Sequence, residues 1–309
     1  MVRPSFFFGA AGVLAVIGVV ACGDDATGGG GSGAAGGTGS GAGPVGGAGD
    51  CGSHTTSTEP DFSSPPGRFT LRAEPEFATF DGSVLSSAPI DFHVESERSG
   101  LCRLLTYTPS NCTPACDPTE LCIDSQCVAQ PTVIDAGNLV IDDFQSAPIQ
   151  VSGTDGIYYW SSDPSYLPGS RARLVASGGD AGAFDLEACV PDAVSPTSDW
   201  SALLAARQPG EDVVLAWSNP RAGARIYLRM TTGIGTHGGI SPVEVECEGP
   251  DMGMLTLPGD YLDALYAQGW SCGRCGDNQL KRYFSAETTT PSGVVRFRAE
   301  AWTGFFFIP

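Results

Sequence analysis

The chain has 309 residues, and its 35 acidic residues outnumber its 16 Lys and Arg residues, which gives a formal net charge of −19 at pH 7. A surface with this charge repels nucleic acids and anionic lipid head groups, so nucleic acid is excluded as a partner. The first 58 residues combine an apolar segment with a Gly-rich run and cannot build a hydrophobic core, so about 250 residues remain for folding.

Residues 1–21 have the layout of a secretory signal peptide. One basic side chain, Arg3, precedes an unbroken apolar stretch over residues 6–21. The stretch is shorter than the roughly 20 residues that a membrane-spanning helix needs, and no basic stop-transfer cluster follows it, so we expect cleavage. The alternative is an uncleaved apolar helix that contains a buried Cys22.

The end of this segment, Val19-Val20-Ala21-Cys22, resembles the lipobox of bacterial lipoproteins in all four positions. The resemblance implies that Cys22 becomes the new N-terminus and carries a diacylglyceryl thioether and an amide-linked acyl chain such as palmitate. Several acyl chains, at about 0.8 kcal/mol per buried CH₂, give a stable membrane anchor. Gly23 stands where inner-membrane lipoproteins commonly carry Asp, which favours the outer membrane, on its periplasmic or surface face.

Residues 22–58 are predicted to be a flexible tether behind the lipidated cysteine. Gly, Ala, Ser and Thr dominate residues 23–50, and such a coil spans roughly 30 Å on average. Residues 31–36 match the dinucleotide fingerprint G-x-G-x-x-G, but they lie in low-complexity sequence rather than between a strand and a helix. We interpret the match as compositional and predict no cofactor.

Residues 59–105 are predicted to form a short β segment, because residues 69–73 and 90–94 alternate between apolar and polar side chains. The pattern does not show whether these strands join the main sheets or form a small sheet of their own. Residues 106–130 are predicted to be a disulfide knot. Four cysteines stand there in the spacing C-x3-C-x5-C-x4-C, and the segment has too few apolar residues to fold by burial alone.

Apart from Cys22, ten cysteines remain, an even number in a chain that the leader sends to an oxidising compartment. We therefore predict disulfides and leave their connectivity open. A zinc site in the knot is disfavoured because no His lies nearby. A redox-active C-x-x-C at 272–275 is disfavoured because no βαβ pattern surrounds it. The disulfide candidates are Cys51, Cys102, Cys112, Cys116, Cys122, Cys127, Cys189, Cys247, Cys272 and Cys275.

Residues 131–309 are predicted to form a β-sandwich domain, because short apolar or alternating runs are separated by Gly, Pro, Asp and Ser. In residues 225–230 and 242–248 the apolar side chains share one face, which is typical of a half-buried strand. One short helix is expected at 261–268, with Asp260 as N-cap and Gly269 as stop. The strands are expected at 138–144, 149–152, 157–161, 171–176, 183–190, 212–217, 225–230, 242–248, 254–257, 279–286 and 295–301. The predicted fold class is mainly β, an antiparallel sandwich of Ig-like or jelly-roll-like type with a disulfide-rich insert.

The order of these parts, together with several short motifs, resembles uncharacterised surface lipoproteins of Gram-negative bacteria with GC-rich genomes. The motifs are GLC at 100–102, AGNLVID at 136–142, AGAFDL at 181–186, LAW at 215–217, THGG at 236–239, ECE at 246–248 and DMGMLTLP at 251–258. The likeness covers nearly the whole chain. It implies a fold and an address, and it carries no reaction, ligand or catalytic residue.

No assembled catalytic group is evident in the sequence. The only histidines are His54, His93 and His237, and the chain lacks a G-x-S-x-G elbow, an H-E-x-x-H motif, a P-loop and an EF-hand loop. We therefore predict no catalytic, cofactor-binding or metal-binding residue and expect no enzyme. His237 occupies a Gly-rich turn, which is more often a surface position than a functional one.

The best indication of binding is the aromatic run Tyr158-Tyr159-Trp160, because alternate residues of a strand face opposite sides. Tyr159, Trp160 and His237 are the speculative ligand contacts. The favoured alternative places Tyr158 and Trp160 in the core and Tyr159 at the surface. The first hypothesis is a non-enzymatic envelope lipoprotein whose disulfide-braced sandwich serves structural or adhesive interaction with an envelope protein or glycan. The second is a binding module for glycan or Ca²⁺.

Overall fold

The computed structural model of the protein describes residues 57–73, 77–145, 147–162, 169–232, 240–269 and 278–304, all within the compact unit Val45–Pro309. Several predictions fall outside these residues: the signal peptide, Cys22 and nearly all of the tether, and also Cys51, His237, Cys272 and Cys275. Within the described ranges, no helix is long and apolar enough to cross a membrane.

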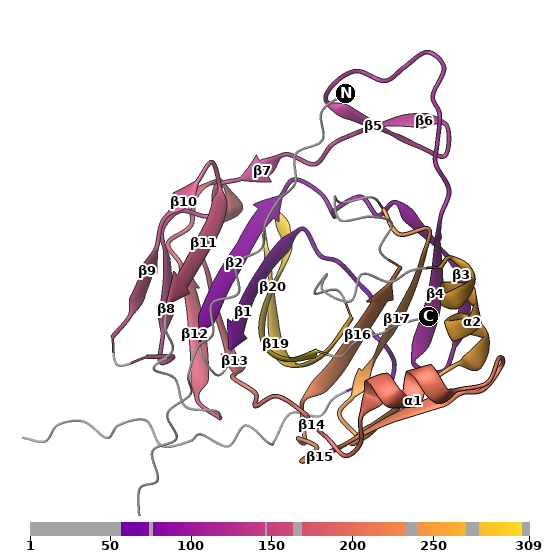
Figure 1. The fold of residues 1–309 in the computed structure, drawn as a ribbon. Helices are drawn as coiled ribbons and strands as arrows, with labels where there is room; N and C mark the ends of the chain where they lie inside the picture. Colours follow the sequence, from indigo (N-terminus) through magenta and orange to yellow (C-terminus); the bar gives the residue numbers. More distant parts are fainter. Residues whose placement is uncertain are drawn as a thin grey trace, which may run out of the picture. The chain divides into compact units, whose positions relative to one another are not determined.

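The largest sheet in the described part of the chain has eleven strands (Figure 1). In spatial order they are β10 (Gly153–Thr154), β11 (Ile157–Ser162), β2 (Ala78–Leu85), β1 (Gly67–Ala73), β20 (Gly293–Gly304), β19 (Gln279–Thr290), β16 (Arg225–Thr231), β17 (Val243–Pro250), β4 (Cys102–Tyr107) and β3 (His93–Ser99), and β7 (Val133–Ile134) pairs with β2. All neighbours are antiparallel except β1 and β20, which run parallel. Residues 67–107 thus contribute four strands to the main sheet, which answers the question that the sequence left open.

Three smaller sheets complete the described β structure. One has the order β13 (Phe184–Cys189), β12 (Arg171–Ala176), β8 (Leu139–Asp142) and β9 (Ile149–Val151); the second has β14 (Ser195–Pro196), β15 (Val213–Ser218) and β18 (Met254–Leu257); the third is the hairpin of β5 (Glu120–Ile123) and β6 (Gln126–Ala129). The prediction of a mainly β, antiparallel fold is confirmed, and a strand occupies each of the eleven predicted ranges.

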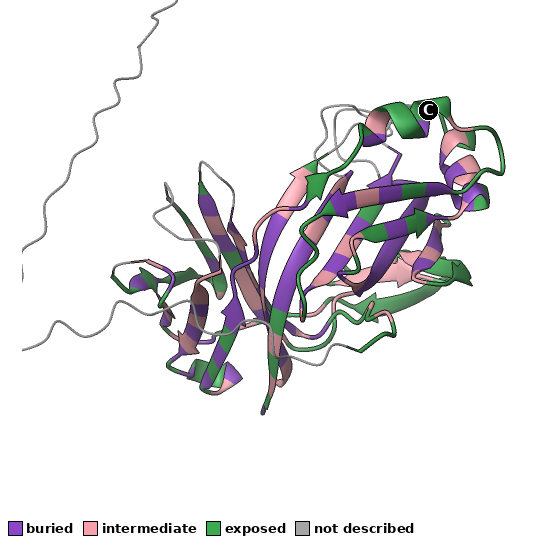
Figure 2. Ribbon diagram, turned by 90° about the horizontal axis from the view of Figure 1, so that it is seen from below, coloured by how far each residue is buried: buried purple, intermediate pink, exposed green. Residues whose placement is uncertain are grey.

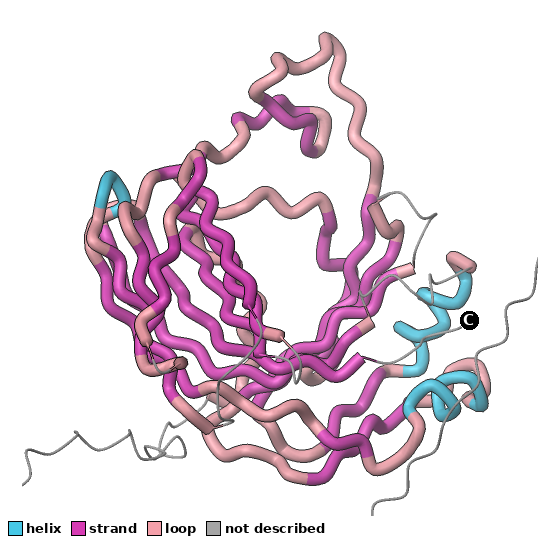
Figure 3. The backbone as a smooth tube through the Cα atoms, turned by 60° about the vertical axis from the view of Figure 1, so that its left-hand side comes forward, coloured by secondary structure: helices cyan, strands magenta, loops and turns pink. Residues whose placement is uncertain are grey.

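The large sheet is strongly curved (Figures 1 and 3). Its two faces carry different side chains. The outer, convex face is largely apolar and packs against the β13–β12–β8–β9 sheet and the β14–β15–β18 sheet, which gives the layered arrangement of a sandwich. One core joins Phe69 and Phe297 of the large sheet to Leu174 of β12. A second core joins Leu228 and Val245 to the β15–β18 sheet and its helices. Figure 2 shows the resulting alternation of buried and more exposed residues along the strands.

The structure has two α-helices in its described part, α1 (Trp200–Ala206) and α2 (Gly259–Ala267), where one was expected. Asp199 caps α1 by accepting a hydrogen bond from the Ala202 amide, and Trp200 and Leu204 are buried, but seven residues are too few to show a helical period. The expected helix begins two residues early, at Gly259, so Asp260 is not its N-cap. The Gly259 amide donates a hydrogen bond to Asp212 instead.

Disulfides join the described cysteines, as predicted, and their connectivity is now visible. Cys112–Cys122 and Cys116–Cys127 brace the β5–β6 hairpin. Cys102, ten residues before the first knot cysteine, lies in β4 and bonds to Cys247 at the paired position of β17. Cys189 is also disulfide-bonded. These bonds place the folded unit in an oxidising, extracytoplasmic environment.

Candidate functional site

The inner, concave face of the large sheet is polar and yet largely covered. On β17, Val243, Val245 and Cys247 face the outer core as predicted, and Glu244, Glu246 and Glu248 face inward. The expectation of a half-buried strand is wrong for this face, because the three carboxylates are only 3%, 9% and 0% exposed. The curved sheet and the segment that crosses it enclose them.

Each of these glutamates has an arginine partner. Arg229 binds Glu244 with an Nη2–Oε1 distance of 2.7 Å, Arg103 binds Glu246 with an Nη2–Oε2 distance of 2.6 Å, and Arg225 binds Glu248 with an Nη2–Oε2 distance of 2.7 Å. Buried charges of this kind are tolerated only when they are paired and hydrogen-bonded. The ladder therefore fixes the positions of the strands from β16 to β4.

Two tyrosines add hydrogen bonds to the ladder. Tyr227 donates to Glu246, and Tyr283 donates to Glu248. Burial, followed by the nearby negative charge of Glu246, raises the pKa of Tyr227 well above its usual value. Burial also raises the pKa of Tyr283. Both phenols consequently stay protonated and serve as donors.

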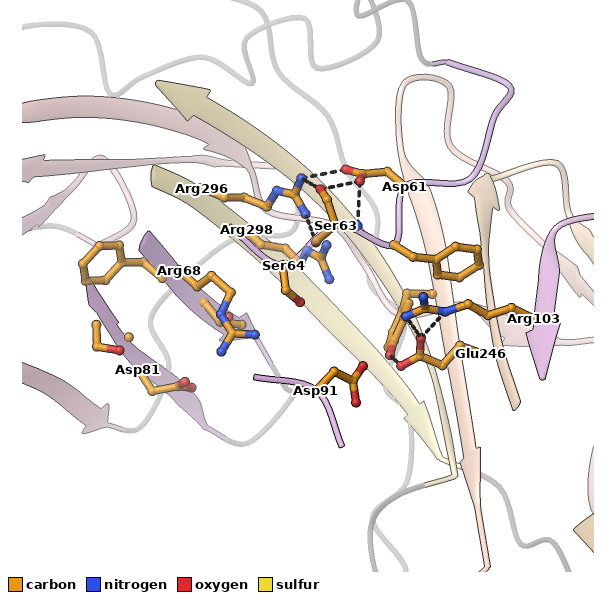
Figure 4. A pocket seen from close by; sticks show the side chains of 16 residues that line it. Asp61, Ser63, Ser64, Arg68, Asp81, Asp91, Arg103, Glu246, Arg296 and Arg298 are labelled. Carbon is orange, nitrogen blue, oxygen red and sulfur yellow. Dashed lines mark hydrogen bonds and ion pairs between the residues drawn. The ribbon is translucent and has the colours of Figure 1, made fainter. Parts of the chain in front are cut away.

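The segment 57–66, which we call the strap, crosses the inner face and leads into β1. Asp61 binds Arg296 with an Oδ2–Nη2 distance of 2.7 Å, and Arg296 also donates to the Ser63 carbonyl at 3.0 Å. Arg225 donates to the carbonyls of Ser57 and Glu59. The strap is thus attached to both β20 and β16, and it forms one wall of the cavity in Figure 4.

Beneath the strap lies a cavity of about 380 Å³. Its walls come from the strap, from β1, β2, β20, β16, β17 and β4, and from Asp91 before β3. Nearly all of the lining side chains are charged or carry hydroxyl groups, so the cavity suits a polar ligand. Its volume falls in the range of about 300 to 1,000 Å³ that is typical of small-molecule sites.

Four arginines line this cavity, and two of them are unpaired. Arg296 and Arg103 are neutralised by the carboxylates described above, whereas the side chains of Arg68 and Arg298 make no ion pair or hydrogen bond with any residue that the structure describes. Arg298 instead lies over the ring of Tyr283, with 3.9 Å from its Cζ to the ring centroid. Burial and the positive charge of Arg298 lower the pKa of Arg68, although its side chain remains accessible from the cavity.

Asp81 of β2 lies on the same inner face and lines the cavity on the side toward β11. Burial raises the pKa of its carboxyl group, against the opposing charge of Arg72. The sheet register pairs Asp81 with Thr70 on one side and with Tyr159 on the other. A row of polar side chains therefore extends from the cavity toward the exposed Tyr159.

Of the speculative ligand contacts, the structure leaves one accessible on this face. Tyr159 is 64% exposed, whereas Trp160 lies on the core face and packs edge-on against Phe144. Tyr158 is fully buried, as predicted by the alternative that placed Tyr158 and Trp160 in the core. Its hydroxyl group donates a hydrogen bond to Asp135. His237 lies outside the described residues.

His93 is held between strands. Its Nε2 lies 2.8 Å from the Ser241 carbonyl oxygen and 3.4 Å from Glu244, and its Nδ1 lies 3.5 Å from Asp91. The Ser241 hydroxyl group donates to the Val243 carbonyl rather than to the imidazole. This geometry links β3 to the start of β17, and it does not have the hydroxyl–imidazole contact of an activated nucleophile.

Among the described residues, one group of three could offer atoms to a metal ion: Cys112, Cys116 and Cys127. All three are disulfide-bonded, so none presents a thiolate. No other such group of His, Cys, Asp or Glu occurs among the described residues, and the Ca²⁺ alternative stays a prediction.

Neither a scan against protein-family models nor a search of the curated proteins found a match to this chain. The site has to be interpreted from its own chemistry. The sequence contains one signal for it that the predictions did not use, because Arg68, Thr70 and Arg72 alternate with Phe69 and Leu71. This pattern shows a polar face on β1, but it cannot show that β20 brings Arg298 beside it.

Proposed function

We propose that the protein is a non-enzymatic envelope lipoprotein that serves adhesion by binding a polar ligand, of which an envelope or surface glycan is the foremost candidate, in the inner cavity. The observation that carries this proposal is the cavity itself. Its walls are charged, its scaffold of buried ion pairs is rigid, and Arg68 and Arg298 have hydrogen-bonding groups to spare.

Rigid preorganisation supports a binding role. The strands that present the lining side chains are paired with neighbours on both sides, and the Arg–Glu ladder fixes their spacing. A ligand that enters such a site pays little for ordering it.

The cellular address rests on the sequence and on the disulfides. The lipobox-like end at Cys22, the tether and the oxidised cysteines agree with export and lipid anchoring, and Gly23 favours the outer membrane. Mass spectrometry of the mature protein from host membranes tests this part. We expect an acylated N-terminal Cys22, and an unmodified N-terminus upstream of it would contradict the anchor.

Binding is tested with the full chain carrying Cys22→Ser, which removes the lipid without changing the folded unit. We expect saturable binding to a subset of polar saccharides on a glycan array. Absence of saturable binding across neutral and acidic saccharides would leave a structural role as the better account.

A further inference from the structure

We infer that the inner cavity recognises a carboxylate-bearing saccharide, with Arg68 and Arg298 together holding the carboxylate. This inference deepens the proposed binding function and rests on it. It names the ligand class as oligosaccharides that contain a hexuronic acid.

Arg68 and Arg298 form a local cluster of guanidinium groups that no described carboxylate contacts, within a lining that holds four arginines and four acidic residues. The parallel register of β1 and β20 places Arg68 beside Arg296 and places Thr70 beside Arg298, so the three guanidinium groups belong to one small area of the inner face. Asp61 and Glu287 neutralise Arg296. Asp81 attracts Arg68 without forming an ion pair with it, so a bound anion would be the first direct partner that Arg68 and Arg298 share.

The geometry of the two guanidinium groups suits a carboxylate. A guanidinium group presents a planar fork of donors that matches the two oxygens of a carboxylate. Arg298 is oriented by its stacking on Tyr283, and the hydroxyl group of that tyrosine is fixed in turn by Glu248. Figure 4 shows Arg68 and Arg298 on adjacent strands at the same cavity, with Ser64 of the strap between them.

The lining residues other than the arginines suit sugar hydroxyl groups. Asp81 and Asp91 make no ion pair with an arginine at the cavity and can accept hydrogen bonds from a ligand. Thr70 and Ser83 add hydroxyl groups, and Tyr227 adds an aromatic ring. A small inorganic anion would use the arginines and leave these groups without a partner.

A peptide carboxylate fits less well. Peptides commonly bind sheets by adding a strand to a free edge. The strands β1, β2 and β20 at the cavity are each paired on both sides, so their backbone groups are already used in the sheet. Recognition here has to go through side chains, as it does for sugars.

The test uses the Cys22→Ser full chain and isothermal titration with a panel of oligouronates and their methyl esters. The ester keeps the ring and the hydroxyl groups and removes the charge. We expect at least one oligouronate to bind saturably and its ester to bind at least about tenfold more weakly. Arg68→Gln and Arg298→Gln should each weaken binding roughly tenfold to a hundredfold. The matched control is Arg171→Gln, which changes an exposed ion pair on β12 and should leave the affinity for the oligouronate unchanged.

The outcomes separate the inference from the proposed function. If neutral saccharides bind as well as the acids, and the arginine variants bind normally, the carboxylate inference is wrong and the binding function stands. If sulfate displaces the oligouronate at equal concentration, the site takes a simple anion and the saccharide part is wrong. If nothing binds saturably, both are wrong. The acid and ester comparison on the unmutated cavity decides the matter even if an arginine variant does not fold.

Discussion

Arg282 and Asp251 form an ion pair from which water is excluded, with 2.7 Å between Nε and Oδ2 and both side chains fully buried. Asp251 also accepts hydrogen bonds from Trp217 Nε1 and from the Arg221 amide. Arg282 donates to the Asn219 carbonyl at 2.8 Å. The pair lies on the outer face of the large sheet, where it ties β19 to the loops that connect the two cores.

Removing one partner of this pair should be strongly destabilising, because the other charge is left buried without compensation. We expect Asp251→Asn to lower the free energy of unfolding by about 3 to 5 kcal/mol. Chemical denaturation measures the change. The control is Glu187→Gln, which breaks the exposed pair with Arg171 and should cost less than about 1 kcal/mol. Equal costs at the two sites would contradict the structural role given to Asp251.

The Cys102–Cys247 disulfide should contribute more to global stability than either bond of the knot. It closes a loop of 145 residues inside the main sheet, whereas Cys112–Cys122 closes one of 10 residues in a separate hairpin. Replacing both Cys102 and Cys247 by Ala should cost about 4 to 5 kcal/mol, because the unfolded chain gains freedom with loop length. Replacing Cys112 and Cys122 should leave the main unfolding transition in place. A larger effect from the knot pair would overturn this ranking.

Tyr158 should make stability fall in alkali. Burial, and then its hydrogen bond to Asp135, raise the pKa of Tyr158 from 10.0 to about 12. Because the folded value is the higher one, this contribution is complete below about pH 10 and is lost as the pH rises toward 12. In urea unfolding across this pH range, the free energy of unfolding should fall less steeply with pH for Tyr158→Phe than for the unmutated protein. The exposed Tyr159→Phe is the control, and a slope unchanged in both variants would contradict the assignment.

The strap should detach from the sheet in acid. Partial burial acts to raise the pKa of Asp61, but hydrogen bonds from Ser63 and the charge of Arg296 outweigh it and lower the pKa. The stabilisation by ionised Asp61 is therefore present above its unfolded pKa of about 3.9 and is lost as the pH falls through the lower folded value. Hydrogen exchange of residues 57–66 should accelerate in that window.

Asp61→Asn should produce the same acceleration at neutral pH, because it removes the charge that binds Arg296. The matched control is Glu59→Gln in the same strap, since Glu59 contributes its carbonyl group rather than its exposed side chain. Identical exchange in the two variants would show that the Asp61 carboxylate does not hold the strap.

The sequence was sufficient for the β-rich fold because burial on one face leaves a period-2 pattern. Residues 171–176 and 254–257 form strands with the predicted limits. The same pattern cannot show whether the polar face will be covered. From the sequence pattern alone, Glu244, Glu246 and Glu248 would be assigned to a solvent-exposed face. The curvature of the sheet and the strap bury them.

The candidate site could not be predicted because its parts are distant in the sequence. Arg68 and Arg298 meet through a parallel pairing of β1 with β20, and no local pattern specifies the partner of a strand. Of the aromatic run, Tyr159 lies beside Asp81 on the inner face, and its role as a ligand contact stays a prediction. The even number of cysteines predicted disulfides. It could not assign Cys247 as the partner of Cys102, because the spacing of cysteines does not report their connectivity.

Filling the inner cavity with a large side chain shows whether this cavity is the binding site. Ser83 lines the cavity from β2, and its replacement by Trp would fill the space while leaving the ion pairs of β17 in place. Titration of the Cys22→Ser chain with the saccharide panel, repeated with Ser83→Trp added, is the measurement. We expect saturable binding that the added Trp abolishes while the melting temperature changes little. Binding that persists at full strength with the cavity filled, or no binding by the unblocked chain, would contradict the account.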